Sequence, residues 1–359
     1  MTFEEARAQF PVLERFAYLN AGTFGPLARS VADVMAAEQQ RALAEGRMNS
    51  PLFGRWLDLR ERVRAGIAAT IGVPPERLAL TSSTTEACNV VLLGLGLDPG
   101  DEIVTTDSEH PGLMLPLIAS GATLQITPTR ELDPGDLLEA VDARVTPRTK
   151  LIALSHVTWT TGTALPWREV REATGVPVLV DGAQSVGAIP VDASPADFYT
   201  VSSQKWLCGP DLTGALAVAD PDGLRLAMPS TLSQRKIDLG IGTFEQRENA
   251  DRFDTAFTPM GSLEGLAAAL ELHPDWRYER AREATANCRR LLAQRFEVVT
   301  PPDHGTLVSF RTDDPAAKTK ALFDRGVIVR DIPGTDLLRA SCGWWTSDDD
   351  LERLLDALG

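Results

Sequence analysis

The stretch Asp197-Phe198-Tyr199-Thr200-Val201-Ser202-Ser203-Gln204-Lys205-Trp206-Leu207-Cys208-Gly209-Pro210 decides the fold. An apolar run with strand character ends in polar residues, and a lysine, a tryptophan and a Gly-Pro break follow it. Such a strand would place Lys205 at the edge of a sheet, in a crevice beside an aromatic ring. An amine held there can have its pKa lowered and can act as a Schiff-base nucleophile. The alternative is a lysine whose ammonium group simply reaches water from a strand end.

Length and composition are those of a soluble globular protein. The chain has 359 residues, enough for a large domain with a full core and a smaller second domain. Hydrophobic residues make up 43% and the net charge is -15, which argues against a nucleic-acid surface because such a surface needs clustered positive charge. The first residues are acidic and polar, unlike a secretory signal, and no apolar run reaches membrane-spanning length. We therefore expect a cytoplasmic protein with neither nucleic-acid nor membrane partners.

Cysteine and histidine are too dispersed to predict a metal site. Cys88, Cys208, Cys288 and Cys342 form no Cys-x-x-Cys pair, and no His-Glu-x-x-His pattern is present. Neither a zinc site nor a disulfide framework is expected.

Short apolar strands alternate with helices over about 140 residues in the middle of the chain. Several of the strands are continuous Leu/Ile/Val runs, which suits strands covered on both faces. The alternation predicts an α/β domain in which a mostly parallel sheet carries helices on both sides. Strands are expected at 78–81, 102–106, 123–127, 150–155, 177–180, 199–202 and 215–219, with helices at 85–95, 111–119 and 134–143.

The pattern changes at both ends of this region. Residues 27–45 and 52–71 have helical spacing, and residues 242–259 are irregular and polar, as in a connection between domains. Beyond them we expect a smaller α+β domain, with helices in 262–295, 315–325 and 347–358 and strands at 296–300, 306–311 and 327–329. The expected division is an N-terminal segment 1–15 that packs with the small domain, a large domain 16–245 and a small domain 246–359.

Polar residues follow the strands, at the edge where parallel sheets bind ligands. Thr81-Ser82-Ser83-Thr84-Thr85-Glu86 opens a helix and suits a phosphate, although the same pattern also occurs as an ordinary helix cap. His110 follows the next strand and could present its ring face to a planar ligand, and His156 to Gly162 form a second aromatic and hydroxyl-rich loop.

A carboxylate ends one of the strands predicted to be buried. Asp181 follows Val178-Leu179-Val180, and Gln184 lies three residues later. A buried carboxylate is costly unless it meets a positive group, and a protonated pyridine nitrogen would be one. The alternative is an ordinary Asp-Gly turn. A phosphate cradle, a stacking ring, a carboxylate and an amine together are what pyridoxal phosphate (PLP) requires.

The order of these motifs resembles the class V family of fold-type I PLP enzymes, which includes cysteine desulfurases, isopenicillin-N epimerase and cysteine/cystine C–S lyases. The resemblance runs nearly end to end, from Tyr18-Leu19-Asn20 to Arg339-Ala340-Ser341-Cys342, and is nearest to the C–S lyases. It is carried by residues 106–112, 155–159, 161–162, 252–254, 264–270 and 307–310. It implies a three-layer α/β/α large domain, a small α+β C-terminal domain and a homodimer.

The resemblance also implies roles for individual residues. Lys205 would bind the cofactor covalently, His110 would stack on its ring, Asp181 would pair with the ring nitrogen and Gln184 would contact the ring hydroxyl. Thr84, Thr85, Ser202 and Gln204 would hold the phosphate, where most relatives have histidine in place of Gln204. The partner's threonine that reaches the phosphate falls within residues 255–258, best at Thr258. Arg339 would bind the substrate carboxylate, and Asn20, Thr23 and Trp159 would also contact the substrate.

By this resemblance the favoured reaction is β-elimination from a cysteine- or cystine-type amino acid, which yields pyruvate, ammonia and sulfide or persulfide. Lys205 would be the general base. A desulfurase needs a cysteine on a mobile loop, and residues 330–338 contain none. Epimerisation and transamination use the same lysine, so they remain alternatives. A further alternative is a relative without activity that acts as a binding partner, and the intact Lys205, Asp181 and Arg339 speak against it.

Overall fold

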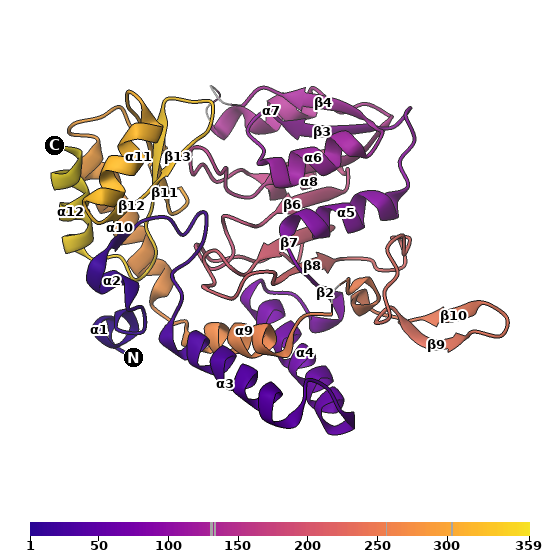
Figure 1. Ribbon diagram of the computed structural model, residues 1–359. Helices are drawn as coiled ribbons and strands as arrows, with labels where there is room; N and C mark the ends of the chain where they lie inside the picture. Colours follow the sequence, from indigo (N-terminus) through magenta and orange to yellow (C-terminus); the bar gives the residue numbers. More distant parts are fainter. Residues whose placement is uncertain (130–131, 133, 256, 303) are drawn as a thin grey trace.

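The computed structural model describes residues 1–129, 132, 134–255, 257–302 and 304–359. Its centre is a seven-stranded sheet in the order β2-β8-β7-β6-β5-β3-β4 (Figure 1). Strand β8 runs in the opposite direction to the other six strands, which are parallel to one another. The carboxyl ends of these six strands therefore lie at the same edge of the sheet. The strands are β2 (Leu78–Thr81), β3 (Glu102–Thr106), β4 (Thr123–Thr127), β5 (Thr149–Ser155), β6 (Val178–Asp181), β7 (Phe198–Ser202) and β8 (Gly214–Val218).

Helices cover both faces of this sheet, which confirms the predicted α/β class. Leu80, Ile152 and Val180 pack on one face with helices α4 (Ser50–Thr70), α7 (Leu137–Asp142), α8 (Trp167–Thr174) and α9 (Met260–Leu272). Ala79 and Leu179 face the other side, against α5 (Thr84–Leu95) and α6 (Pro111–Ala119). Helix α3 (Arg29–Glu45) packs on α9. Strands β2, β3, β6, β7 and β8 are buried along their whole length, which explains their continuous apolar runs.

A smaller unit lies beside the sheet. Its antiparallel sheet has the order β11 (Leu307–Arg311), β14 (Leu337–Ser341) and β13 (Arg330–Asp331). Helices α10 (Arg277–Leu292), α11 (Pro315–Asp324) and α12 (Asp348–Leu358) pack around it, and β1 (Ala17–Tyr18) pairs with β12 (Val327–Ile328). The short helices α1 (Phe3–Arg7) and α2 (Val12–Arg15) lie next to this unit (Figure 1). Short 3-10 helices occupy Pro75–Arg77, Pro134–Asp136 and Ala250–Phe253.

Helix α9 packs with the large unit although the sequence predicted residues 246–359 to form the small domain. Its glycines allow this close approach, because a Cβ at Gly265 would lie 2.7 Å from Pro210 and 3.0 Å from Met35. The next helix, α10, contributes Ala284 and Cys288 to the core of the small unit. We propose that the division between the domains lies in the connection 273–276 rather than at 245.

Two elements form where no strand was expected. A hairpin of β9 (Gln234–Asp238) and β10 (Thr243–Gln246) projects from the large unit, and β14 occupies residues expected to be loop (Figure 1). Conversely, residues 296–300 form only an isolated bridge, Val298 to Phe310, instead of a strand. Within the described part of the chain, no helix is long and apolar enough to cross a membrane.

Candidate active site

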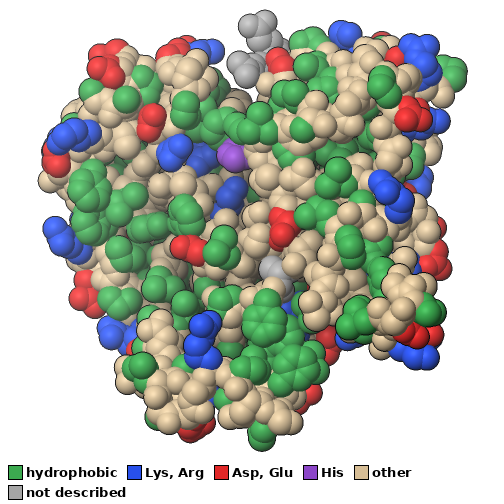
Figure 2. Space-filling model, turned by 45° about the vertical axis from the view of Figure 1, so that its right-hand side comes forward, with side chains coloured by type: hydrophobic (Ala, Val, Ile, Leu, Met, Phe, Trp, Pro, Cys, Tyr) green, Lys and Arg blue, Asp and Glu red, His purple; other side chains and the backbone are tan. Residues whose placement is uncertain are grey.

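A cavity of about 180 Å³ lies at the carboxyl edge of the large sheet, where the small unit meets it. Figure 2 shows a histidine and basic side chains in the hollow between the two halves of the visible face. The cavity brings together residues from loops after β1, β3, β5, β6 and β7 with two arginines of the small sheet. The lining residues are Gly22, Thr23, His110, Trp159, Gln184, Lys205, Arg330 and Arg339.

Lys205 lies in the turn after β7 and faces this cavity. Burial lowers its pKa to about 8, Asp181 raises it and Arg339 lowers it. The loop after β1 contacts this turn, because Gly25 N–H donates to the Gln204 carbonyl at 2.8 Å. A Cβ at Gly25 would lie only 2.1 Å from the Lys205 carbonyl oxygen, so only glycine allows this approach. The amine is therefore placed by two segments far apart in sequence.

Asp181 ends β6 and is only 4% exposed. Burial raises its pKa, whereas the charge of Lys205 and hydrogen bonds from Ala183 N–H and Thr200 lower it. The bond from Ala183 N–H to Oδ1 is 2.8 Å long. Such a carboxylate favours a positive partner.

Gln184 is fixed by two hydrogen bonds. Its Nε2 donates to the Gly22 carbonyl at 2.8 Å, and its Oε1 accepts from Trp206 Nε1 at 3.0 Å. Trp206 is fully buried, so the amide has one orientation. The predicted Asp181 and Gln184 thus lie on one rigid turn.

His110 is the N-cap residue of α6, and its Nδ1 accepts from Gly112 N–H at 2.9 Å. Burial, together with the positive charges of Lys205, Arg339 and Arg330, lowers its pKa to about 4. The ring is therefore neutral at physiological pH. It meets the Trp159 ring edge to face, with the ring centroids 5.0 Å apart.

The predicted phosphate residues gather at the N-terminus of α5. Thr84 Oγ1 and Ser202 Oγ are 2.9 Å apart and both side chains are buried. Thr85 lies against the first turn of α6, where its Oγ1 would be 2.9 Å from a Cβ at Gly112. Gln204 Oε1 is buried and has no hydrogen-bond partner in the described residues. Hydroxyl groups and the unpaired first-turn N–H groups of a helix form a suitable anion cradle.

Arg339 projects from the middle of β14 and is 1% exposed. It donates to the Trp159 carbonyl at 2.7 Å and to Thr23 Oγ1 at 3.3 Å, while its buried Nε has no partner in the described residues. Burial and the nearby Arg330 lower its pKa. Gly22 allows it to enter, since a Cβ there would lie 2.8 Å from Nη2. A guanidinium held in this way needs an anion.

Arg330 is the residue that sequence reasoning missed. It pairs with Arg339 across the β13–β14 ladder and also lines the cavity. Its guanidinium makes no hydrogen bond or ion pair with another side chain in the described part of the chain. The signal in the sequence was an arginine at the end of the apolar run 327–329, the same pattern that drew attention to the other strand ends.

Of the predicted site residues, Thr23, His110, Trp159, Gln184, Lys205 and Arg339 line the cavity, whereas Asp181 and the phosphate residues Thr84, Thr85, Ser202 and Gln204 do not. Asn20 and Thr258 do not line it either. Asn20 Oδ1 accepts from Thr23 Oγ1 at 2.8 Å and so supports Thr23 from behind. Thr258 is buried in the loop before α9, and its carbonyl accepts from Trp56 Nε1 at 2.9 Å. It lies beside a second cavity, on the side of α4 and α9.

Comparison with known proteins places this geometry in a family. The family model described as aminotransferase class-V matches residues 18–331. The chain belongs to the class-V aminotransferase family. Members of the class-V family use PLP.

Three proteins illustrate what this class-V chain is similar to. Isopenicillin N epimerase of Streptomyces clavuligerus is 31% identical over 99% of this chain and 97% of its own length. A cysteine desulfurase of Haloferax volcanii is 30% identical over 84% of this chain and 78% of its own. The solved complex of the cystine C–S lyase C-DES with its product cysteine persulfide is 30% identical, has a TM-score of 0.90, and covers 98% of this chain and 99% of that chain. In another C-DES structure, of a lysine-to-alanine mutant, glycine is covalently linked to the PLP cofactor.

Proposed function

We propose that this chain is a PLP-dependent C–S lyase that cleaves cystine or a similar amino acid carrying two carboxylates. The observation that carries this proposal is the arginine pair, Arg330 and Arg339, facing one cavity with Lys205. Two guanidinium groups at adjacent cross-strand positions repel one another unless anions bind them. Cystine offers two carboxylates joined by a disulfide, whereas cysteine offers one.

The residues fit the cofactor. Asp181 offers a buried carboxylate for a protonated ring nitrogen, and the neutral His110 ring offers a face for stacking. The Thr84 and Ser202 hydroxyl groups offer donors for a phosphate cradle, and Gln204 would contribute through its amide nitrogen. Bound PLP would supply an aldehyde that captures the substrate amine and a ring that draws electrons from the α-carbon.

The chain's own residues then handle charge and protons. Arg339 binds the α-carboxylate next to the reacting carbon, which a planar fork of donors does well. Arg330 binds the distal carboxylate and so orients the disulfide. Lys205 Nζ, with its pKa near 8, takes the α-proton in its neutral form. The Cβ–S bond breaks, its electron pair leaves with the sulfur as cysteine persulfide, and water converts the three-carbon fragment into pyruvate and ammonia.

The desulfurase alternative needs a reactive thiolate beside the substrate. All four cysteines are buried, and a hydrogen bond with Cys288, together with burial, raises the pKa of the Cys342 thiol. Those thiols suit packing better than nucleophilic attack. Epimerisation remains the second candidate because an epimerase relative matches 99% of this chain.

The test is an incubation of the PLP-loaded protein with cystine in deuterated water. We expect a yellow protein that is bleached by borohydride with Lys205 labelled, and stoichiometric pyruvate and persulfide from cystine. Deuterium washing into recovered amino acid without pyruvate would reject the lyase and favour an epimerase. A colourless protein that cannot be reconstituted would favour the inactive relative that serves as a binding partner.

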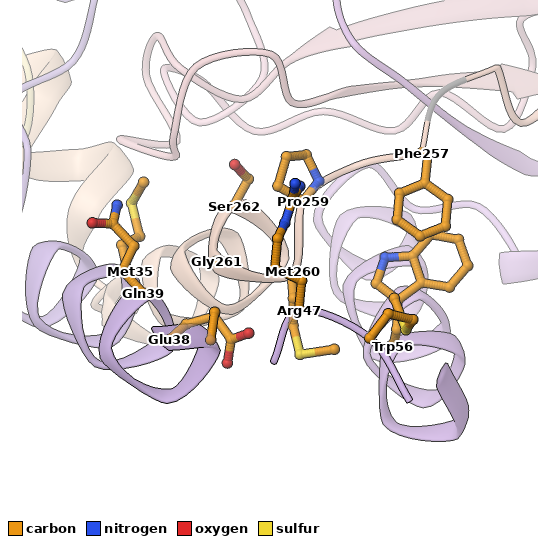
Figure 3. A pocket seen from close by; sticks show the side chains of 12 residues that line it. Met35, Glu38, Gln39, Arg47, Trp56, Phe257, Pro259, Met260, Gly261 and Ser262 are labelled. Atoms are coloured by element: carbon orange, nitrogen blue, oxygen red, sulfur yellow. The ribbon is translucent and has the colours of Figure 1, made fainter. Parts of the chain in front are cut away.

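We further propose that the chain forms a homodimer. The supporting feature is a cavity of about 460 Å³ between α3, α4 and α9, in which Phe257 stacks on Trp56 with ring centroids 4.2 Å apart (Figure 3). Phe257 is 62% exposed, and the large apolar residues Ile237, Leu239 and Ile241 of the projecting hairpin are exposed as well. A second copy of the chain would cover these surfaces. The cytoplasmic location expected from the sequence stays a prediction.

A further inference from the structure

Glu109 is a buried acid beside the site whose role is not explained by the proposed reaction. It is 7% exposed and lies between the carboxyl ends of β3 and β5. Four other buried acids, Glu38, Glu102, Asp254 and Asp350, each pair with an arginine. Glu109 pairs with no cation in the described part of the chain, and its hydrogen bonds all come from neutral groups.

The hydrogen bonds around Glu109 indicate which of its two carboxyl oxygens carries the proton when the side chain is neutral. Thr106 Oγ1 accepts from Ser108 N–H, so its own hydrogen goes to Glu109 Oε1 at 2.7 Å. Ser155 N–H can only donate, and it does so to Oε2 at 3.0 Å. The Ser155 hydroxyl also contacts Oε2 and can either donate or accept. A proton on Glu109 therefore lies on Oε2, shared with Ser155 Oγ.

Glu109 is electrically coupled to Asp181. Ser155 is the direct strand neighbour of Asp181, so the two acids approach the same end of the sheet. Burial raises the pKa of Glu109 to about 7; the hydrogen bonds from Ser155 and Thr106 lower it, and the charge of Asp181 raises it. Cys88 of α5 faces both carboxylates, and burial together with their charges raises the pKa of its thiol. His110 is the next residue along the chain and its ring is neutral. Lys205 is the cation that acts on Asp181, whose pKa its charge lowers. Two coupled carboxylates in low dielectric seldom both ionise without a cation.

We propose that Glu109 holds a proton in the apoenzyme and releases it when a second positive charge, in addition to that of Lys205, pairs with Asp181. Glu109 is then a positioning residue for the charge under the cofactor ring. The phosphate cradle lies on the β2 and β7 side of Asp181, whereas Glu109 lies on the β5 and β3 side. The cofactor charge nearest Glu109 is therefore the ring nitrogen. An ionised Glu109 strengthens the hold on a protonated ring. This inference rests on the proposed function, because it takes PLP as the cofactor.

The test compares the PLP dissociation constants of the wild-type and Glu109→Gln apoenzymes from about pH 6 to about pH 8.5, since one pKa unit of coupling equals about tenfold in affinity. The Glu109→Gln amide keeps the shape and cannot ionise. We expect equal affinities at the acidic end and wild-type binding about tenfold tighter at the alkaline end. Calorimetry in buffers of different ionisation enthalpy should show more protons released by the wild type than by Glu109→Gln near neutral pH.

Two further variants keep the test sharp. Ser155→Ala removes the hydroxyl donor to the ionised carboxylate and keeps the backbone N–H donor, so the pKa of Glu109 should rise. The pH above which the PLP affinity exceeds that of Glu109→Gln should therefore be higher than in the wild type. Glu102→Gln, at the other end of β3 and paired with Arg148, is the matched control and should show a pH-independent ratio to the wild type. A Glu109→Gln ratio that stays constant with pH, or that favours the variant at alkaline pH, would overturn the inference. Failure of the wild type to bind PLP at any pH would instead reject the proposed function.

Discussion

At the scale of single residues, the site is a set of charges placed where burial makes each depend on a partner. Lys205, Asp181 and Arg339 were predicted because each stands in a motif after a strand or in a family segment. Arg330 and Glu109 were not, because one follows a short apolar run and the other precedes the more conspicuous His110. Sequence motifs mark residues that touch ligands, and they say little about the neighbours that tune those residues.

Arg330 should raise kcat/KM for substrates that carry two carboxylates and have little effect on substrates that carry one. We expect Arg330→Ala to lower kcat/KM for cystine about thirtyfold, the cost of a charged hydrogen-bonded pair, with little effect on β-chloroalanine. Steady-state pyruvate assays on both substrates measure this. Arg311→Ala removes an exposed arginine paired with Glu297 and Asp336 and serves as the control. Equal losses on both substrates would mean that Arg330 does not bind the distal carboxylate.

The lowered pKa of Lys205 should be visible in how fast the apoenzyme captures PLP. Only the neutral amine attacks an aldehyde, so the rate should rise about tenfold per pH unit below the pKa and level off above it. The midpoint is expected at about pH 8. Stopped-flow absorbance measures the rate, and Lys205→Arg should not react. A midpoint near the ordinary lysine value of 10.5 would show a solvated amine.

At the scale of elements, side chains along one face of α4 form hydrogen bonds with the segment that precedes α9. Trp56, Arg60 and Arg64 are four residues apart and so share a face of the helix. Arg60 and Arg64 bind Asp254 at 2.6 and 2.8 Å, and Asp254 Oδ1 also accepts from Leu80 N–H at 2.7 Å. The edge strand β2, helix α4 and residues 254–258 thus meet at one buried carboxylate.

Removing the charge of Asp254 should cost about 3–5 kcal/mol of the free energy of unfolding, because two buried arginines lose their partner. Denaturant unfolding of Asp254→Asn measures the loss. Asp336→Asn, whose partner Arg311 is exposed, should cost at most about 1 kcal/mol. Similar small losses in both variants would show that the buried cluster does not stabilise the fold.

The strands of the large sheet were predictable because burial on both faces leaves an uninterrupted apolar signal. Strand β14 was missed because Arg339 interrupts its apolar run, and β10 because all its residues are exposed and carry no burial pattern. Helix α9 was found, yet its place in the large unit depends on glycine contacts with Met35 and Pro210, which no local pattern shows.

At the scale of the whole molecule, the apolar surfaces point away from the small unit. The Phe257–Trp56 stack and the hairpin both belong to the large unit, on whose side α3, α4 and α9 lie (Figure 1). A hairpin projecting alone is marginally stable in water, so a covering partner would stabilise it.

The proposed dimer should therefore break at this face. We expect Phe257→Glu to shift the protein from dimer to monomer in size-exclusion chromatography with light scattering, because a charge would replace the stacked ring. Leu115→Glu is the control, since Leu115 is 62% exposed on α6 over the opposite face of the sheet. A wild-type protein that is monomeric at the same concentration would contradict the homodimer.

The short segment after β1 has a mechanical consequence. It leaves the small sheet's side at Tyr18, supports Gln184 through the Gly22 carbonyl, and ends at Gly25 on the Gln204 carbonyl. The segment thus connects the turn that carries Lys205 with the small sheet that carries Arg339. Because this segment contacts both units, we expect any movement of the small unit against the large one to be transmitted to the turn that carries Lys205.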